Sequence, residues 1–324
     1  MVIHVISTVN GEENEGMRNI ATQIARALEK DNTVMYSTLH DFTKYPSRCK
    51  QSDCTFIFAR CISRLYEIIR FCSIFSKNLY VFVVQKPDHG FIQKCRKHPL
   101  PCSYFTVCKE DVAALCVRTG YCIYDLPVGI NRDKFYPVSS DIRKEFKRKY
   151  GFDTEKPLVI HVGHCSVGRG LEDFQYIDSS LFQSMVVASG MFDNDTVKST
   201  LLNSGVKIHT GYLENINEIY QMADAYFFPT QNDEYVISIP LSVMEALSCG
   251  VPVLAYSSFG KLRNINAASG SVCLIDSPKE ISGALTRLTA IKHEASYLLD
   301  PVSWEEVAGM VFKMINKGYS DYAQ

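Results

Sequence analysis

The sequence predicts an α/β protein of two domains, each built on a parallel β-sheet. Its 324 residues exceed the length at which one hydrophobic core usually suffices. Short apolar runs alternate with segments of helical periodicity in both halves of the chain, which is typical of repeated βαβ units. A polar, proline-containing segment, residues 136–141, separates the halves and is interpreted as the interdomain linker.

The individual elements follow from apolar periodicity. In the first half a glycine-bearing loop, 10–16, precedes a helix whose apolar positions Ile20, Ile24, Ala27 and Leu28 recur at helical spacing. Strands are expected at 2–9, 33–37, 55–59, 80–84, 104–108 and 121–125, with helices at 62–76 and 110–119.

In the second half, Ser303 and Glu306 form a capping-box pattern that opens the last helix. Before it, strands are expected at 157–162, 185–188, 206–209, 225–228, 253–256 and 272–275, with helices at 172–179, 196–203, 216–223 and 241–248.

Composition excludes several classes of protein. The net charge of −1 offers no basic field for nucleic acid. No run of 18 uncharged apolar residues is present, and the apolar stretch 55–84 is interrupted by five charged residues, so a membrane-spanning helix is not expected. Because a predicted strand begins at Val2, we expect no secretory signal and a cytoplasmic protein.

The twelve cysteines show no Cys-x-x-Cys pairing and no zinc-ligand spacing. We interpret them as small buried apolar residues, with disulfides as the alternative for a hyperthermophilic source.

Two segments place anion-binding groups at the carboxyl edge of the second sheet. Residues 162–170, VGHCSVGRG, follow the apolar strand 157–162. Glycines and an arginine after such a strand present backbone N–H groups and a guanidinium where phosphoryl ligands bind in open α/β folds. The second segment, residues 240–253, opens a helix with Pro240 and returns to a strand after Gly250.

These segments resemble the nucleotide-sugar half of retaining family 4 glycosyltransferases of the GT-B fold. Residues 127–137, PVGINRDKFYP, resemble the interdomain signature of that family, and residues 216–230 resemble the strand that leads to its sugar pocket. The resemblance covers most of residues 105–260, with weaker agreement over residues 1–40.

The resemblance implies two Rossmann-like domains that face each other across a cleft. Residues 1–137, completed by the C-terminal helix 303–324, would form the acceptor domain, and residues 138–302 the donor domain. The implied activity is sugar transfer from a UDP- or GDP-type donor with retention, without a cofactor or metal. The acceptor is left open among glycans, lipids and small molecules, and the oligomeric state is not fixed.

By resemblance, Arg169 replaces the lysine that binds the pyrophosphate, and Gly163, Gly168 and Gly170 allow close backbone approach. His164 stands where the family has an arginine. It could donate a hydrogen bond to phosphate or simply be a loop histidine.

Glu245 matches the second glutamate of the Glu-x7-Glu motif, which binds the ribose hydroxyls. The first glutamate is replaced by Ile237, and Glu234 on the preceding loop is the candidate to reach the sugar. This departure keeps a catalytically silent nucleotide-sugar binder, and an inverting GT-B transferase, as alternatives.

Further candidate groups surround this site. The backbone from Ser238 to Leu241 could offer N–H groups to the donor. Tyr212 could stack on the nucleobase or serve packing alone. In the first domain, Gly16 would face the donor phosphate, and His89 is the candidate on the acceptor side, with a surface loop histidine as the alternative.

Two patterns have competing interpretations. Asp193-Asn194-Asp195 has the form of a metal-binding Asp-x-Asp, but its position before a helix favours Asp195 as an N-cap, so no metal site is expected. The segment 62–76 carries Arg64 and Arg70 beside apolar residues. It could contact lipid-linked acceptors at a membrane surface, or be a core helix with solvated basic edges.

Overall fold

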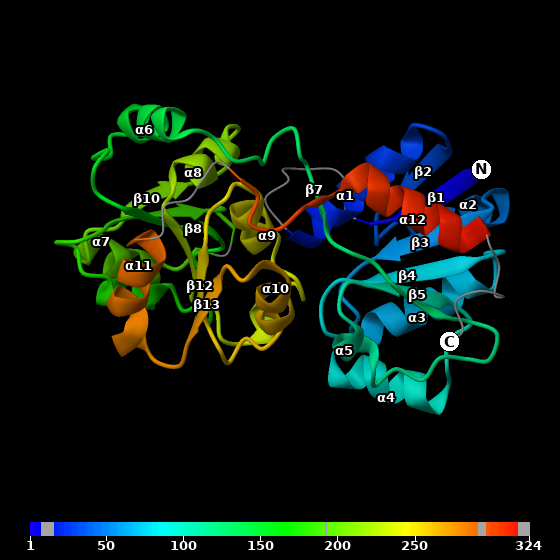
Figure 1. Ribbon diagram of the computed structural model, residues 1–324. Coiled ribbons are helices and arrows are strands. Elements are labelled where there is room, and N and C mark those ends of the chain that lie inside the picture. Colours follow the sequence, from blue (N-terminus) through cyan, green and yellow to red (C-terminus); the bar gives the residue numbers. More distant parts are fainter. Residues whose placement is uncertain (8–15, 192, 291–295, 317–324) are drawn as a thin grey trace. The chain divides into compact units, whose positions relative to one another are not determined.

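The computed structural model describes residues 1–7, 16–191, 193–290 and 296–316, which form two units (Figure 1). The first unit comprises residues 1–129, 237–239 and 302–324, and the second comprises residues 130–236 and 240–301. Residues 130–137, which the sequence assigns to the first domain, therefore cluster with the second unit. Most of the predicted glycine-bearing loop 10–16, including Gly11, lies outside the described residues.

The first unit is built on a six-stranded parallel sheet of order β2-β1-β3-β4-β5-β6. The strands are β1 (Val2–Ile6), β2 (Thr33–Ser37), β3 (Cys54–Phe58), β4 (Leu79–Val83), β5 (Ser103–Thr106) and β6 (Ile123–Asp125). Every residue of β3 and β4 is buried, as expected for strands covered on both faces.

Helices cover both faces of this sheet. Figure 1 shows α12 lying beside α1 on one side of the sheet, with α3 and α4 on the other. A row of aromatic rings lies on the α1 side: Phe58 stacks on Phe82 at 3.9 Å, and Phe82 on Phe105 at 4.8 Å. The helices are α1 (Gly16–Glu29), α2 (Tyr45–Gln51), α3 (Ser63–Ser73), α4 (His89–Lys97), α5 (Lys109–Val112) and α12 (Trp304–Asn316).

The second unit repeats the architecture with a parallel sheet of order β10-β9-β8-β11-β12-β13. From β8 the chain adds β9 and β10 on one side, and from β11 it adds β12 and β13 on the other side. The direction of strand order therefore reverses between the neighbouring strands β8 and β11, and their carboxyl ends form the topological switch point. The strands are β8 (Leu158–Gly163), β9 (Gln183–Ala188), β10 (Lys207–Thr210), β11 (Ala225–Phe228), β12 (Val253–Tyr256) and β13 (Val272–Ile275).

The helices of the second unit are α6 (Ser140–Lys149), α7 (Asp195–Asn203), α8 (Ile216–Met222), α9 (Leu241–Ser248), α10 (Leu262–Ser269) and α11 (Ile281–Ala290). Short 3-10 turns occur at Phe42–Lys44, Leu171–Tyr176, Asp233–Tyr235 and Pro278–Glu280. Two short strands, β7 (Gly129–Ile130) and β14 (Val302–Ser303), pair with each other where the chain passes between the units.

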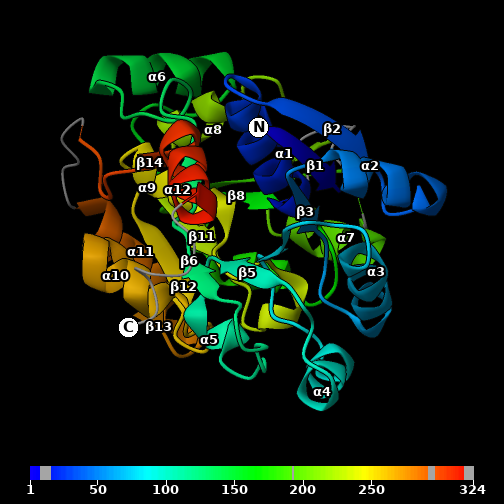
Figure 2. The same cartoon turned by 90° about the vertical axis from the view of Figure 1, so that its right-hand side faces the viewer.

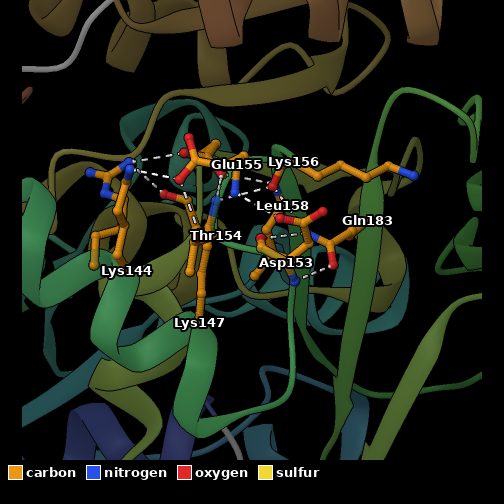
Figure 3. Close-up of polar contacts among 11 residues, drawn as sticks. Lys144, Lys147, Asp153, Thr154, Glu155, Lys156, Leu158 and Gln183 are labelled. Atoms are coloured by element: carbon orange, nitrogen blue, oxygen red, sulfur yellow. Dashed lines mark hydrogen bonds and ion pairs between the residues drawn. The ribbon is translucent and has the colours of Figure 1, made fainter.

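A polar network fastens α6 to the amino-terminal edge of the second sheet (Figure 3). The buried Lys147 ammonium lies 2.6 Å from the Asp224 carboxylate and also donates to the Lys156 carbonyl at 3.1 Å. The same carboxylate accepts the Leu158 backbone N–H at 2.7 Å, at the start of β8. Gln183 donates to the carbonyl oxygens of Asp153 and Lys156, which orders the turn between α6 and β8.

Several predicted elements differ from the structure. The helix expected at 172–179 is only the 3-10 turn Leu171–Tyr176, because Ile177 is extended. The helix expected at 110–119 ends as α5 at Val112. The linker expected at 136–141 already contains the start of α6, which is capped by the Ser139 side chain.

Other predictions are confirmed. Ser303 and Glu306 form the expected capping box, since each side chain accepts the backbone N–H of the other residue, at 2.7 and 3.1 Å. All twelve cysteines lie in the described part of the chain and carry free thiols, nine of them buried.

Candidate functional site

The loop that follows β8 carries Arg169 to the switch point of the second sheet. Gly168 and Gly170 adopt positive φ angles of 87° and 72°, which a residue with a side chain rarely adopts. A Cβ atom on Gly170 would lie 2.6 Å from the Pro229 carbonyl oxygen, so only glycine lets the loop approach the end of β11 this closely. The Thr230 hydroxyl donates to the Arg169 carbonyl at 3.1 Å and fixes the loop there.

Arg169 is half-buried, and within the described part of the chain its guanidinium has no hydrogen-bond or carboxylate partner. Burial lowers the pKa of Arg169 to about 10, and the guanidinium therefore remains protonated at neutral pH. A partly desolvated cation without a compensating anion favours binding of a negatively charged ligand. Its position at the carboxyl ends of β8 and β11 is where ligands bind in such sheets.

His164 lies beside Arg169 as a neutral group. Its Nδ1 is 2.5 Å from the Ser189 hydroxyl. Burial lowers the pKa of His164 to about 4, and the positive charge of Arg169 acts in the same direction. His164 therefore offers hydrogen bonds at neutral pH but no charge, unlike the arginine of the related family.

Buried residues of β8 and β11 hold the carboxyl ends of these two strands in place. Nδ1 of His161 lies 3.0 Å from the Phe227 carbonyl oxygen and must donate to it, because a carbonyl only accepts. Burial lowers the pKa of His161 to about 3. A Cβ atom on Gly163 would lie 2.9 Å from Nε2 of His161, which explains the glycine at the end of β8.

Tyr226 connects this strand end to the first turn of α9. Its hydroxyl lies 2.8 Å from the Ser242 hydroxyl and 3.2 Å from the Val162 carbonyl oxygen. His161, Tyr226 and Ser242 are not among the site residues predicted from the sequence. Only folding brings these three side chains together. Tyr226 and Ser242 nevertheless belong to residues 216–230 and 240–253, two of the segments that carry the resemblance.

Glu245 lies on α9 and is half-buried. The buried Tyr220 hydroxyl donates to its Oε2 at 2.7 Å. Burial raises the pKa of Glu245 to about 7, and the Tyr220 hydrogen bond and the charge of Lys134 oppose that rise. One carboxylate oxygen is thus oriented by Tyr220 while the other is left for a ligand.

The first turn of α9 offers backbone donors. The N–H groups of Val243 and Met244 bond to the Pro240 carbonyl oxygen, whereas those of Leu241 and Ser242 have no acceptor among the described residues. Such groups at a helix N-terminus favour anions. Ser238, by contrast, clusters with the first unit: its N–H donates to Val84 at 2.8 Å and its hydroxyl to Asp111.

Tyr212 follows the end of β10 and is 53% exposed. Gly190 and Gly211 beside it both have positive φ angles, and a Cβ atom on Gly190 would lie 3.4 Å from the Gly211 Cα. The Gly211 N–H donates to Ala188, and Ser189 N–H to Gly163, so the ends of three neighbouring strands are tied together. An exposed ring on this edge is available for stacking.

The remaining predicted residues belong to other elements of the two units. Glu234 is exposed in the 3-10 turn Asp233–Tyr235. Gly16 begins α1 in the first unit, where a Cβ atom would lie 2.9 Å from the Ile237 side chain. His89 is the exposed first residue of α4, not a loop residue, and its Nε2 lies 3.2 Å from the Gln93 amide.

The Asp-x-Asp sequence has a structural role in α7. The N-cap is Asn194, whose side chain accepts the Val197 N–H at 3.1 Å, so the prediction that Asp195 is the N-cap is wrong. Asp193 forms an ion pair with Lys198 at 2.5 Å. The described residues contain no cluster of three or more His, Cys, Asp or Glu side chains that could hold a metal ion.

Part of the second unit matches a known protein family. Residues 171–290 match the family model of glycosyl transferases group 1. This segment is therefore similar to glycosyl transferases group 1. It contains Tyr212, Ser242 and Glu245, and begins two residues after Arg169. The resemblance inferred from the sequence is therefore confirmed.

Relatives identified by sequence match part of the chain. Sulfoquinovosyl transferase SQD2 of Arabidopsis thaliana is 25% identical over 51% of this chain and 32% of its own length. Alpha-galactosylglucosyldiacylglycerol synthase of Streptococcus pneumoniae is 23% identical over 45% of this chain and 40% of its own. The match thus spans less than half the length of these relatives.

Solved glycosyltransferase structures share the fold over nearly the whole chain. The Anabaena HepE protein in complex with UDP-glucose aligns with a TM-score of 0.77 at 13% identity, covering 98% of this chain and 100% of its own. Sucrose-phosphate synthase from Thermosynechococcus elongatus aligns with a TM-score of 0.74 at 15% identity, covering 98% of both chains. The GT-B fold class predicted from the sequence is confirmed.

Proposed function

We propose that the protein transfers a sugar from a UDP- or GDP-type nucleotide-diphosphate donor to an acceptor hydroxyl. The half-buried Arg169 guanidinium at the switch point, which has no carboxylate partner in the described part of the chain, is the observation that carries this proposal. The family of residues 171–290 supports it, as does the binding of UDP-glucose by the structurally similar HepE protein.

In this proposal each group has one task. Arg169 and the free N–H groups of Leu241 and Ser242 stabilise the charge that develops on the diphosphate as the glycosidic bond breaks. The free oxygen of Glu245 accepts hydrogen bonds from the ribose hydroxyls. Tyr212 stacks on the nucleobase, and His164 donates a neutral hydrogen bond. The reaction retains the anomeric configuration and needs no metal.

The acceptor is proposed to be a glycan or a lipid-linked molecule, met at the cytoplasmic face of a membrane. The name of one relative, a diacylglycerol glycoside synthase, favours a lipid. No helix in the described part of the chain is long and apolar enough to span a bilayer.

A catalytically silent nucleotide-sugar binder is the second candidate. It is favoured by Ile237, an apolar residue packed over Gly16 where the related family has a glutamate, and by the neutral His164. Incubation with a panel of UDP- and GDP-sugars, with and without acceptor extracts, distinguishes the two. The transferase releases nucleoside diphosphate from at least one donor. A protein that is stabilised against heat by nucleoside diphosphate yet releases none from any donor is the silent binder.

Metal independence is tested by chelation together with a substitution in the Asp-x-Asp sequence. Asp193→Asn weakens the ion pair with Lys198 but leaves the proposed site intact. We expect donor turnover to be the same with and without EDTA and close to that of wild type in the variant, because neither partner of this partly buried ion pair is among the groups proposed to contact the donor. Loss of turnover in EDTA that Mn²⁺ restores, and that Asp193→Asn reproduces, would reject the proposed mechanism.

A further inference from the structure

The end of α3 exposes a cluster of apolar side chains. Ile74, which follows the last turn of the helix, is 73% exposed, and Phe71 is 37% exposed. The rings of Phe71 and Phe75 meet edge to face at 5.3 Å, which holds the two aromatic residues together. We call Phe71, Ile74 and Phe75 the α3 tip.

The α3 tip lies at the amino-terminal edge of the first sheet. Just beyond the helix, the Ser76 hydroxyl donates at 3.0 Å to Thr55, which lies at the start of β3. Figure 2 shows α2 and α3 next to each other along one flank of the unit. The carboxyl ends of the strands, where ligands bind in such sheets, are at the opposite edge.

Basic side chains surround the α3 tip. The Lys50 ammonium lies 5.4 Å from the centre of the Phe75 ring, and Arg70 and Lys77 are both exposed. Two carboxylates lie nearby, Glu67 at 3.8 Å from Arg70 and Asp53 at 3.7 Å from Lys77. Glu67 also pairs with Lys94 at 2.8 Å, so the cations named here outnumber the carboxylates by four to two. Because exposed ion pairs at these distances contribute little, the cations can turn to other anions.

We propose that the α3 tip is a docking surface for membranes that contain anionic lipids. The exposed Phe71 and Ile74 side chains can enter the interfacial region of a bilayer, with Phe75 packed against the core beneath them, while the basic residues around them meet lipid phosphates. A stable protein interface of about 800 Å² per partner needs far more apolar area than three side chains supply. A second copy of the chain, paired about a twofold axis, would bring the basic residues against their own copies.

Vesicle co-sedimentation of the full chain tests the proposal. The probes are vesicles of phosphatidylcholine alone and of phosphatidylcholine mixed with phosphatidylglycerol. We expect binding to the mixed vesicles that weakens as salt is raised, because the lipid charge is screened. Phe71→Ser/Ile74→Ser should lower the partition coefficient by about tenfold or more. Arg70→Gln/Lys77→Gln should lower it by about fivefold for each removed charge.

Matched substitutions far from α3 serve as controls. Leu202 on α7 is 60% exposed, and Arg263 on α10 is also exposed, so Leu202→Ser and Arg263→Gln remove the same kinds of group from the second unit. Both should bind vesicles like wild type. The proposal is overturned if wild type does not bind mixed vesicles, if the α3 variants bind as well as the controls, or if the α3 tip is found to mediate a dimer in light scattering and not vesicle binding. Nucleoside diphosphate affinity should be unchanged in every variant, so this test stands apart from that of the proposed transfer.

Discussion

At the level of single residues, burial shifts the pKa values of Arg169 and Glu245 in opposite directions, in both cases toward the uncharged form. Arg169 loses solvation and remains a cation, since a pKa of about 10 is still far above neutral pH. Glu245 loses solvation as well, but its pKa of about 7 lets it titrate near neutral pH. Arg169 therefore keeps its charge throughout the physiological range, while the charge of Glu245 depends on pH.

Nucleoside diphosphate affinity should consequently rise with pH through about 7. In the proposed complex the ribose hydroxyls donate to the ionised Glu245, so binding is favoured once its proton is lost. In Glu245→Gln the affinity should be weaker by about 1–3 kcal/mol above that pH, and only the pH dependence that comes from ionisation of the terminal phosphate, near pH 6, should remain. Calorimetric titration at about pH 6 and pH 8 measures both effects. A wild-type affinity that is the same at both values would show that Glu245 does not contact the nucleotide.

The raised pKa of Glu245 also makes the unfolding free energy depend on pH. The folded pKa of Glu245 lies above its ordinary value of 4.5, so the folded state binds the proton more tightly than the unfolded state. The unfolding free energy should fall as pH rises from 4.5 to about 7, and Glu245→Gln should remove that fall.

Candidate site residues could be assigned from the sequence where a motif contains them. Arg169 and Glu245 were assigned from neighbouring residues in the sequence, and the structure places both in the second unit. His161 and Tyr220 were not, because they act through contacts with Phe227 and Glu245 that only folding creates. The N-cap was assigned one residue late, because Asn and Asp have nearly equal capping preference and the sequence places them side by side.

At the level of elements, Asp224 links the start of β8 to α6. Its carboxylate accepts from Lys147 at 2.6 Å and from the Leu158 N–H at 2.7 Å. Asp224→Ala should lower the unfolding free energy by about 3–5 kcal/mol, because it leaves the Lys147 charge buried without its partner. Denaturant unfolding measures the change.

Glu155→Ala is the matched control for that measurement. Glu155 pairs at 2.7 Å with Lys144, which lies on α6 like Lys147. This pair is exposed and should contribute less than about 1 kcal/mol. Equal losses in the two variants would show that burial does not decide the strength of the Asp224 pair.

Element prediction succeeded for long apolar strands and failed for short polar helices. β8 and β11 are recognisable because their residues are almost all apolar. No helix was predicted at α2, α4, α6, α10 or α11, and in α4 and α10 polar residues obscure the apolar period. Their stability depends on packing against the sheets, which periodicity alone does not reveal.

At the level of the whole molecule, the alternation of strands and helices was sufficient to predict two parallel sheets. It could not predict that residues 237–239, inside the sequence of the second unit, cluster with the first. That placement depends on the bonds of Ser238 with Val84 and Asp111, over 100 residues away in the chain. Ile237, which replaces the first glutamate of the Glu-x7-Glu motif, lies in this segment.

The central claim is that Arg169 binds the diphosphate of the donor. Titration calorimetry of UDP and GDP into wild type, Arg169→Ala and Arg169→Lys, all in excess EDTA, tests it most directly. We expect alanine to weaken the preferred nucleotide by about 10- to 100-fold, as for the loss of a charge-assisted hydrogen bond, and lysine to restore part of the affinity. The melting temperatures should differ little from wild type. Wild-type affinity in a folded Arg169→Ala protein would contradict the claim.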